Sequence, residues 1–133
     1  MNSSWEPKAG AAHEEIAKLV TAAGYTLPES YLAFLCISNG GQGPLSVDPF
    51  WLILDSADSV AGALKIGTFT EFFPGLIVIG GNGAGEGVAF DFRSNREAEV
   101  VHFDMTNTDH SESVRPFAAS FTELLALVGE SGS

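Results

Sequence analysis

The chain has 133 residues, 45% of them hydrophobic, which fits a single folded domain and argues against intrinsic disorder. Seventeen Asp and Glu face six Lys and Arg, and the net charge of −11 argues against nucleic-acid binding, because such a protein repels phosphate backbones. One cysteine excludes an internal disulfide, and the chain shows neither a signal peptide nor an apolar run of the roughly 20 residues that span a bilayer, so we expect a cytoplasmic protein.

Two helices are predicted near the start of the chain. Residues 11–23 carry apolar side chains at helical spacing. A second helix is predicted from Pro28, because proline suits the first helical position. The sequence Asn39-Gly40-Gly41 is expected to end this helix, since these residues tolerate a left-handed backbone. Cys36, beside the apolar stripe of the second helix, is interpreted as a small core residue.

The next segment alternates irregular and regular structure. Residues 42–50 are predicted to be a loop, because they contain Gly-Pro and Asp-Pro breakers. The apolar run 51–54 is predicted to be a strand, followed by a third helix capped at Asp55 or Ser56. Trp51 has two interpretations that the sequence leaves open: tryptophan is enriched at binding hot spots, and it is also large and usually buried.

Strands dominate the second half. The continuous apolar run 76–79 is typical of a strand covered on both faces. Residues 88–93 alternate between apolar and other side chains, which predicts a half-exposed strand, and 100–105 is predicted to be another strand. Together these segments predict an antiparallel meander. A last helix over 121–128 is predicted from the capping-box spacing of Ser120 and Glu123.

The order of these elements predicts an α+β fold in which helices pack on an antiparallel-rich central sheet. No repeat or linker divides the chain, so a single domain is expected over residues 1–133.

The glycine-rich stretch 80–87 is interpreted as a turn between two strands. It lacks the third glycine of a dinucleotide fingerprint and the lysine of a phosphate loop, and a strand follows it where such sites have a helix. The dipeptide Asn82-Gly83 is a strong hairpin signal. We therefore expect no nucleotide cofactor.

Residues suited to catalysis or metal binding are few. His102 and Asp104 would share one face of a strand, with Asp109-His110 near, but nothing in this spacing demands a metal site. Asp91 and Asp104 could stand on adjacent strands as paired carboxylates for acid–base chemistry. Solvated sheet positions are the more common role for such residues, so no catalytic, metal or cofactor residue is expected.

The second predicted helix carries a pattern that resembles the SUKH superfamily, which joins fungal cell-wall assembly regulators and bacterial toxin-immunity proteins. In that family a Leu-Pro-x-x-Tyr-x-x-Phe-Leu helix ends in Asn-Gly-Gly, as residues 27–35 and 39–41 do here. A Trp-led strand, a helix, an apolar strand, a glycine-rich turn, a strand ending in Asp, a further strand and a Phe-containing helix follow. The matching segments, within roughly residues 11–128, are 51–54, 55–64, 76–79, 80–87, 88–91, 100–104 and 121–128.

The resemblance implies a SUKH-like, non-enzymatic domain with a core over about 11–128 that binds another protein. In bacterial members the partner is typically a secreted toxin, often a nuclease or deaminase. The resemblance therefore implies an immunity protein that neutralises its toxin in the cytoplasm by occluding the active site. The charge of −11 suits a basic toxin, although acidity also serves solubility alone. The candidate contact residues are Asp48, Trp51, Asp55, Asp58, Glu86, Asp91 and Asp104.

Two alternatives stay open. One is an intracellular regulatory or scaffold module with an endogenous protein partner. The other is a small-molecule enzyme that uses Asp91, His102 and Asp104, which requires a polar pocket where these side chains converge.

Overall fold

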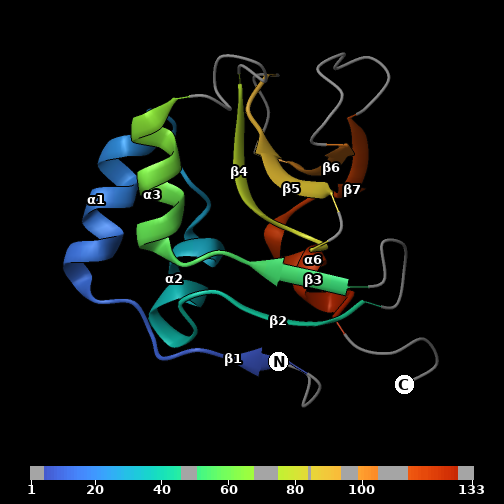
Figure 1. Cartoon of the computed structure of the whole chain (residues 1–133), viewed down its shortest axis with the longest axis horizontal. Coiled ribbons are helices and arrows are strands. Elements are labelled where there is room, and N and C mark those ends of the chain that lie inside the picture. The colour runs from blue at the N-terminus through green and yellow to red at the C-terminus, as the bar shows by residue number, and fades with distance from the viewer. Residues whose placement is uncertain are drawn as a thin grey trace.

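The structure is a computed structural model that describes residues 5–45, 51–67, 75–83, 85–93, 99–104 and 114–128. Within these residues a seven-stranded antiparallel sheet and four helices packed on it form an α+β fold, which confirms the predicted fold class (Figure 1). The strands are β1 (Glu6–Pro7), β2 (Gly41–Pro44), β3 (Trp51–Leu54), β4 (Leu76–Gly81), β5 (Glu86–Asp91), β6 (Glu99–Asp104) and β7 (Arg115–Ala118). The helices are α1 (His13–Ala23), α2 (Glu29–Ile37), α3 (Ala57–Ile66) and α6 (Phe121–Ala126).

The sheet is a meander in which each strand pairs with its neighbours in the sequence, in the order β1-β2-β3-β4-β5-β6-β7. The predicted meander of β4, β5 and β6 is confirmed. The prediction of a loop over 42–50 is wrong for residues 42–44, because these belong to β2. Their glycine and proline usually interrupt a strand, but pairing with β1 and β3 holds them in the sheet.

The main core lies between the sheet and the helices α2 and α6. An aromatic cluster forms its centre: the ring of Tyr31 contacts those of Phe90 and Phe121 edge-on, with centroids 5.0 and 5.1 Å apart. Phe34 packs on Phe121 in the same way at 5.5 Å. Helix α1 packs against α3 on one side of the molecule (Figure 1). In α2, Tyr31, Phe34 and Leu35 are buried in this core, which confirms that the apolar stripe of the second helix packs inward.

The helix ends differ in detail from the prediction. Pro28 is the residue before α2 rather than its first residue, with an extended ψ of 135°. Helix α2 ends because Ser38 adopts an extended backbone, and the left-handed conformations follow at Gly40 (φ 90°) and Gly41 (φ 127°). Helix α6 is shorter than predicted, and Val128 forms a β-bridge instead.

Two burial predictions are wrong. Cys36 is exposed, because it lies on the outer side of α2. Strand β5 is covered on both faces from Gly87 to Phe90 instead of being half-exposed. The reason is a second, smaller core on the far face of the sheet, in which Ala89 packs with Val101 and Phe103.

The glycine-rich turn is confirmed as a connection between β4 and β5. The Asn82 N–H donates to the Glu86 carbonyl oxygen (3.0 Å), and the Glu86 N–H donates to Asn82 Oδ1 (3.1 Å). Gly83 and Gly85 take left-handed conformations with φ of 78° and 94°, which glycine adopts at least cost. The turn is therefore longer than the two-residue Asn82-Gly83 turn that the sequence favoured.

Candidate functional site

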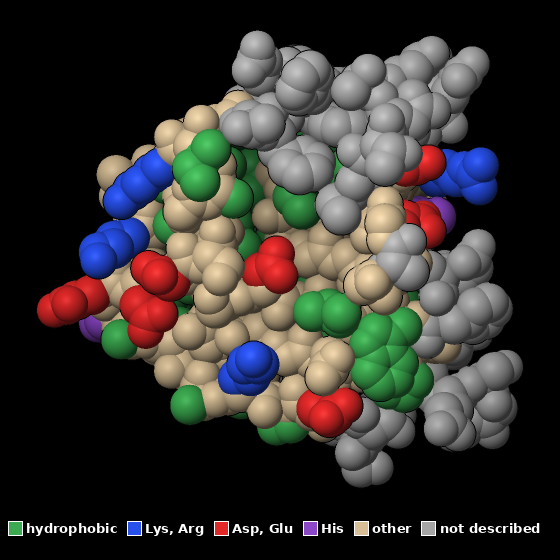
Figure 2. Space-filling model, in the orientation of Figure 1, with side chains coloured by type: hydrophobic (Ala, Val, Ile, Leu, Met, Phe, Trp, Pro, Cys, Tyr) green, Lys and Arg blue, Asp and Glu red, His purple; other side chains and the backbone are tan. Residues whose placement is uncertain are grey.

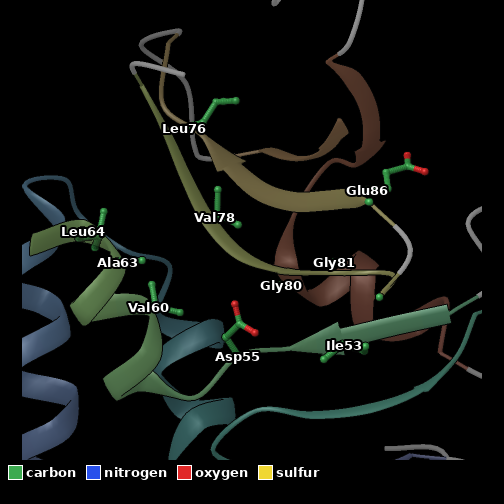
Figure 3. Close-up of a pocket in the computed structure, with 12 residues that line it drawn as sticks. Ile53, Asp55, Val60, Ala63, Leu64, Leu76, Val78, Gly80, Gly81 and Glu86 are labelled. Carbon is green, nitrogen blue, oxygen red and sulfur yellow. The ribbon is translucent and has the colours of Figure 1, made fainter. Parts of the chain in front are cut away.

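Strand β3 pairs with β4 over a short distance only, and a groove lies where the two strands diverge. It pairs with β4 only through Ile53 and Leu54, which lie opposite Gly81 and Gly80. The Asp55 N–H adds one more backbone hydrogen bond to β4 (2.8 Å). The chain then turns into α3, so a helix and not a strand lies beside the remainder of β4 (Figure 3).

Polar side chains fix the first turn of α3. Ser56 Oγ accepts a hydrogen bond from the Ser59 N–H (3.2 Å), which is the capping that the sequence predicted. Asn39 Oδ1 accepts from the Ala57 N–H (2.7 Å), and Asn39 Nδ2 donates to the Glu15 carboxylate (3.3 Å). Helix α3 is thereby tied to α1 and to the end of α2, so the wall of the groove has a fixed position.

The space between α3 and β4 is an apolar groove of about 420 Å³, which we call the α3–β4 groove. Figure 2 shows hydrophobic side chains in this hollow. The backbone of Gly80 and Gly81 lies at its lower end (Figure 3). Its apolar lining side chains are Val60, Ala63 and Leu64 from α3, Leu76 and Val78 from β4, and Ile53 from β3.

Asp55 places a carboxylate in this apolar setting. Its side chain points into the space between α3 and β4 (Figure 3). Burial raises the pKa of the Asp55 carboxyl above its ordinary value. The ion pairs among the described residues are Arg93–Asp91 and His102–Glu86, so Asp55 has no cationic partner there. Asp55 and Ile53 also line a second, smaller depression of about 260 Å³ that reaches Lys8.

Trp51 extends the apolar surface beyond the groove. It is 36% exposed, whereas the next residue, Leu52, is fully buried in the core. Side chains alternate along a strand, so Trp51 and Ile53 share the outer face of β3. The structure thus resolves the two interpretations of Trp51 in favour of a surface position.

Glu86 lies at the margin of the groove, whereas Asp58 does not line it. The backbone of Glu86 lines the groove, but its side chain points away (Figure 3) and pairs with His102 Nδ1. Asp58 is exposed in the first turn of α3, on the side of the helix away from Val60 and Leu64. Of the predicted contact residues, Asp55 and Glu86 therefore line the groove, Trp51 lies on the same strand face as Ile53, and Asp58 points elsewhere.

Asp91 and Asp104 lie elsewhere. Asp104 is opposite Glu86 in the β5–β6 ladder, whereas Asp91 is at the other end of β5, opposite Glu99. Asp91 forms a bidentate pair with Arg93, with distances of 3.0 and 2.9 Å. The predicted contact Asp48 lies outside the described residues.

The arrangement needed for the enzyme alternative is not found. Asp91 and Asp104 each end their strand, and because β5 and β6 are antiparallel they lie at opposite ends of the ladder and cannot act as a pair. His102 is buried, pairs with Glu86 and packs edge-on against Phe117 at 5.2 Å. In the part of the chain that the structure describes, no three His, Cys, Asp or Glu side chains are grouped to hold a metal ion.

The apolar groove residues were missed at the sequence level. Val60 and Leu64 follow a helical stripe, and Leu76 and Val78 belong to a continuous apolar run, so both patterns are those of core residues. Tyr31 was also missed as a neighbour of the site. Its hydroxyl is buried without a hydrogen-bond partner among the described residues, and burial together with the charge of Asp55 raises the pKa of the Tyr31 phenol.

An antiparallel meander with helices packed on one face places the molecule in the α+β class. The chain belongs to the SMI1/KNR4 family (SUKH-1), whose family model matches residues 10–127. A search among curated proteins gave no match. Membership confirms the resemblance seen in the sequence and is compatible with a non-enzymatic immunity or regulatory module. Among the described helices, none is long and apolar enough to cross a bilayer.

Proposed function

We propose that the protein is an immunity protein that binds a cognate bacterial toxin in the cytoplasm and occludes its active site. The observation that carries the proposal is the Asp55 carboxylate, which lies in an apolar groove without a cationic partner among the described residues, together with the exposed Trp51. A carboxylate in such an apolar setting is suited to a Lys or Arg of a partner protein.

In this proposal the contact is centred on Trp51 and Asp55, with Glu86 at its margin. Trp51 supplies apolar contact area, and the carboxylates pair with basic side chains of the toxin. The net charge of −11 steers a basic toxin toward the protein, so the association rate should fall as salt screens the field. Asp48, Asp58, Asp91 and Asp104 remain proposed contacts of a broader acidic surface.

Co-expression with the toxin encoded beside the gene tests the proposal. The wild-type protein should rescue growth, and the double variant Trp51→Ala, Asp55→Asn should fail to rescue while remaining folded. Glu14→Gln is the matched control, because Glu14 is an exposed carboxylate on α1, on the other side of α3 from the groove. It should rescue like the wild type.

Two outcomes would contradict the proposal. One is the absence of both rescue and complex formation with any neighbouring toxin. The other is a growth defect on deletion of the gene in cells without a toxin, together with recovery of an endogenous protein on affinity purification. That second outcome would support a regulatory or scaffold module instead.

A further inference from the structure

The edge of β4 that faces the groove carries backbone groups that no strand among the described residues pairs with. The Phe92 N–H donates to the Gly75 carbonyl oxygen (2.8 Å), and the register continues with Ile77 opposite Phe90. Backbone groups alternate in direction along a strand, so Gly75 and Ile77 face β5. The N–H and C=O groups of Leu76 and Val78 therefore face the groove.

No described strand pairs with this part of β4. Strand β3 is the neighbour on that side, and it contacts β4 only at Gly80 and Gly81. Unpaired N–H and C=O groups at a sheet edge are a template for another strand. Proteins commonly protect such edges. Here the neighbouring described element is the apolar side of α3, which cannot form hydrogen bonds with the backbone groups of β4.

The groove runs along the unpaired part of β4 and has an apolar wall. Val60 and Leu64 line it from α3, and Leu76 and Val78 line it from β4 (Figure 3). A strand rises about 3.3 Å per residue, so the edge from Leu76 to Val78 matches a segment of about three residues. Side chains of such a segment would pack alternately into the groove and out of it.

The charge in the groove specifies one feature of the segment. Asp55 stands where β3 leaves β4, at one end of the free edge, and its carboxylate has no cationic partner among the described residues. An apolar segment alone would bury this carboxylate further without a partner, which is costly. A segment with a Lys or Arg next to aliphatic side chains would satisfy both the carboxylate and the groove.

We propose that the α3–β4 groove binds an extended, basic segment of the partner protein, which adds as a strand to the free edge of β4 and places a Lys or Arg on Asp55. The inference rests on the proposed function only in that the ligand is part of a protein. Main-chain hydrogen bonds to Leu76 and Val78 supply affinity, and the groove and Asp55 supply specificity.

Selection from a phage-displayed library of random heptapeptides tests this directly, without knowledge of the toxin. The selected peptides should combine Lys or Arg with Val, Ile or Leu and should lack internal proline. A synthetic copy of an enriched peptide should slow the amide hydrogen exchange of Leu76 and Val78, measured by NMR. Ile77, whose N–H already faces β5, is the internal control and should not change.

Two variants examine the groove and the charge. Ala63→Arg fills the groove from an exposed position on α3 and should weaken peptide binding by at least about tenfold. Ile66→Arg is its control: it adds the same charge to the same helix outside the groove and should leave peptide binding unchanged. Asp55→Asn should weaken binding of the basic peptide by about tenfold, because the ion pair is lost.

The proposal is overturned if no peptide is enriched, or if enriched peptides bind the Ala63→Arg variant as well as the wild type. It is also overturned if a peptide binds while exchange at Val78 stays fast, which would indicate side-chain binding without strand addition. Toxin rescue that persists in Ala63→Arg would refute the groove as the toxin's site and leave the immunity function standing. If the wild type fails to rescue but still binds the peptide, the immunity function is refuted and the groove remains a peptide-binding site.

Discussion

The side chain of Asn39 connects the end of α2 with α1 and α3. Its oxygen accepts the N–H of Ala57, which is fully buried, and its nitrogen donates to Glu15. The sequence predicted that Asn39, together with Gly40 and Gly41, ends the second helix, but only the two glycines adopt the left-handed conformation. The structural role of Asn39 is therefore to position α3 and, through it, the wall of the groove.

Asn39→Ala should lower the free energy of unfolding by about 1–3 kcal/mol, because it leaves the buried Ala57 N–H without a partner. Urea unfolding measures this change. Asn39→Asp keeps the acceptor for Ala57 but places a second carboxylate beside Glu15, so it should lie between the wild type and Asn39→Ala. Equal stability of Asn39→Ala and the wild type would show that water replaces the amide.

Asp55 is the other residue whose surroundings give a clear expectation. Its pKa is higher in the folded than in the unfolded protein, because burial disfavours the charged form. The Asp55 carboxyl therefore loses its proton at a lower pH in the unfolded protein than in the folded protein. As pH rises above the unfolded pKa, the free energy of unfolding decreases. Below the ordinary Asp value of 3.8 both states hold the proton and the penalty is absent.

Asp55→Asn should consequently be more stable than the wild type near pH 7, and the difference should vanish below pH 3.8. Urea unfolding at several pH values gives the comparison. Asp58→Asn is the control: Asp58 is exposed near the positive end of α3, so its loss should cost about 0.3–1 kcal/mol near neutral pH. A less stable Asp55→Asn protein would mean that the carboxylate has a favourable partner in the fold.

At the scale of elements, the junction of β3 and β4 depends on a glycine. A Cβ on Gly80 would collide with the carbonyl oxygen of Ile53, so only glycine lets the two strands approach here. This close approach ends at Asp55, where the chain enters α3. The groove therefore begins beyond Asp55, the last residue of this contact.

Gly80→Ala should break the β3–β4 pairing and lower the free energy of unfolding by more than about 2 kcal/mol, because both backbones must move apart. The matched control is Gly62→Ala in the middle of α3. Apart from the backbone of α3 itself, no described atom lies within 4 Å of a Cβ at Gly62, so this change should raise stability by about 0.5–1 kcal/mol. Thermal unfolding of both variants shows whether the signs are opposite, and a stabilising Gly80→Ala would contradict the account.

At the scale of the whole molecule, the N-terminal arm completes both the sheet and the core. Strand β1 pairs with β2, and Trp5 is only 6% exposed and packs edge-on against Phe34 at 6.0 Å. These residues precede the family match, which begins at residue 10. The arm therefore adds a structural element to the matched region.

Deletion of residues 1–9 should lower the free energy of unfolding by about 3–5 kcal/mol, because the buried Trp5 is lost. It also uncovers the edge of β2, so the shortened protein should self-associate more readily. Unfolding curves and size-exclusion chromatography test both effects. Trp5→Ala in the full chain should reproduce the loss of stability without the self-association, and an unchanged unfolding midpoint in either protein would contradict this role.

Elements whose signals lie within a few consecutive residues were predicted correctly. Periodicity and caps predicted α1, α2, α3, the start of α6 and the strands β3 to β6, and the helix-two motif indicated the family. Strands β1, β2 and β7 escaped prediction because they are short and contain glycine or proline, so pairing with a neighbouring strand, and not their own residue pattern, holds them in the sheet.

The position of the candidate site depends on how the elements pack in three dimensions. Val60 and Val78 have the pattern of core residues, and they line a groove solely because β3 leaves β4 after two residue pairs. The sequence allows a helix cap at Asp55 or Ser56, and in the structure the cap is Ser56, which leaves Asp55 in the groove. The groove lies between three consecutive elements, and no local pattern records how two strands diverge.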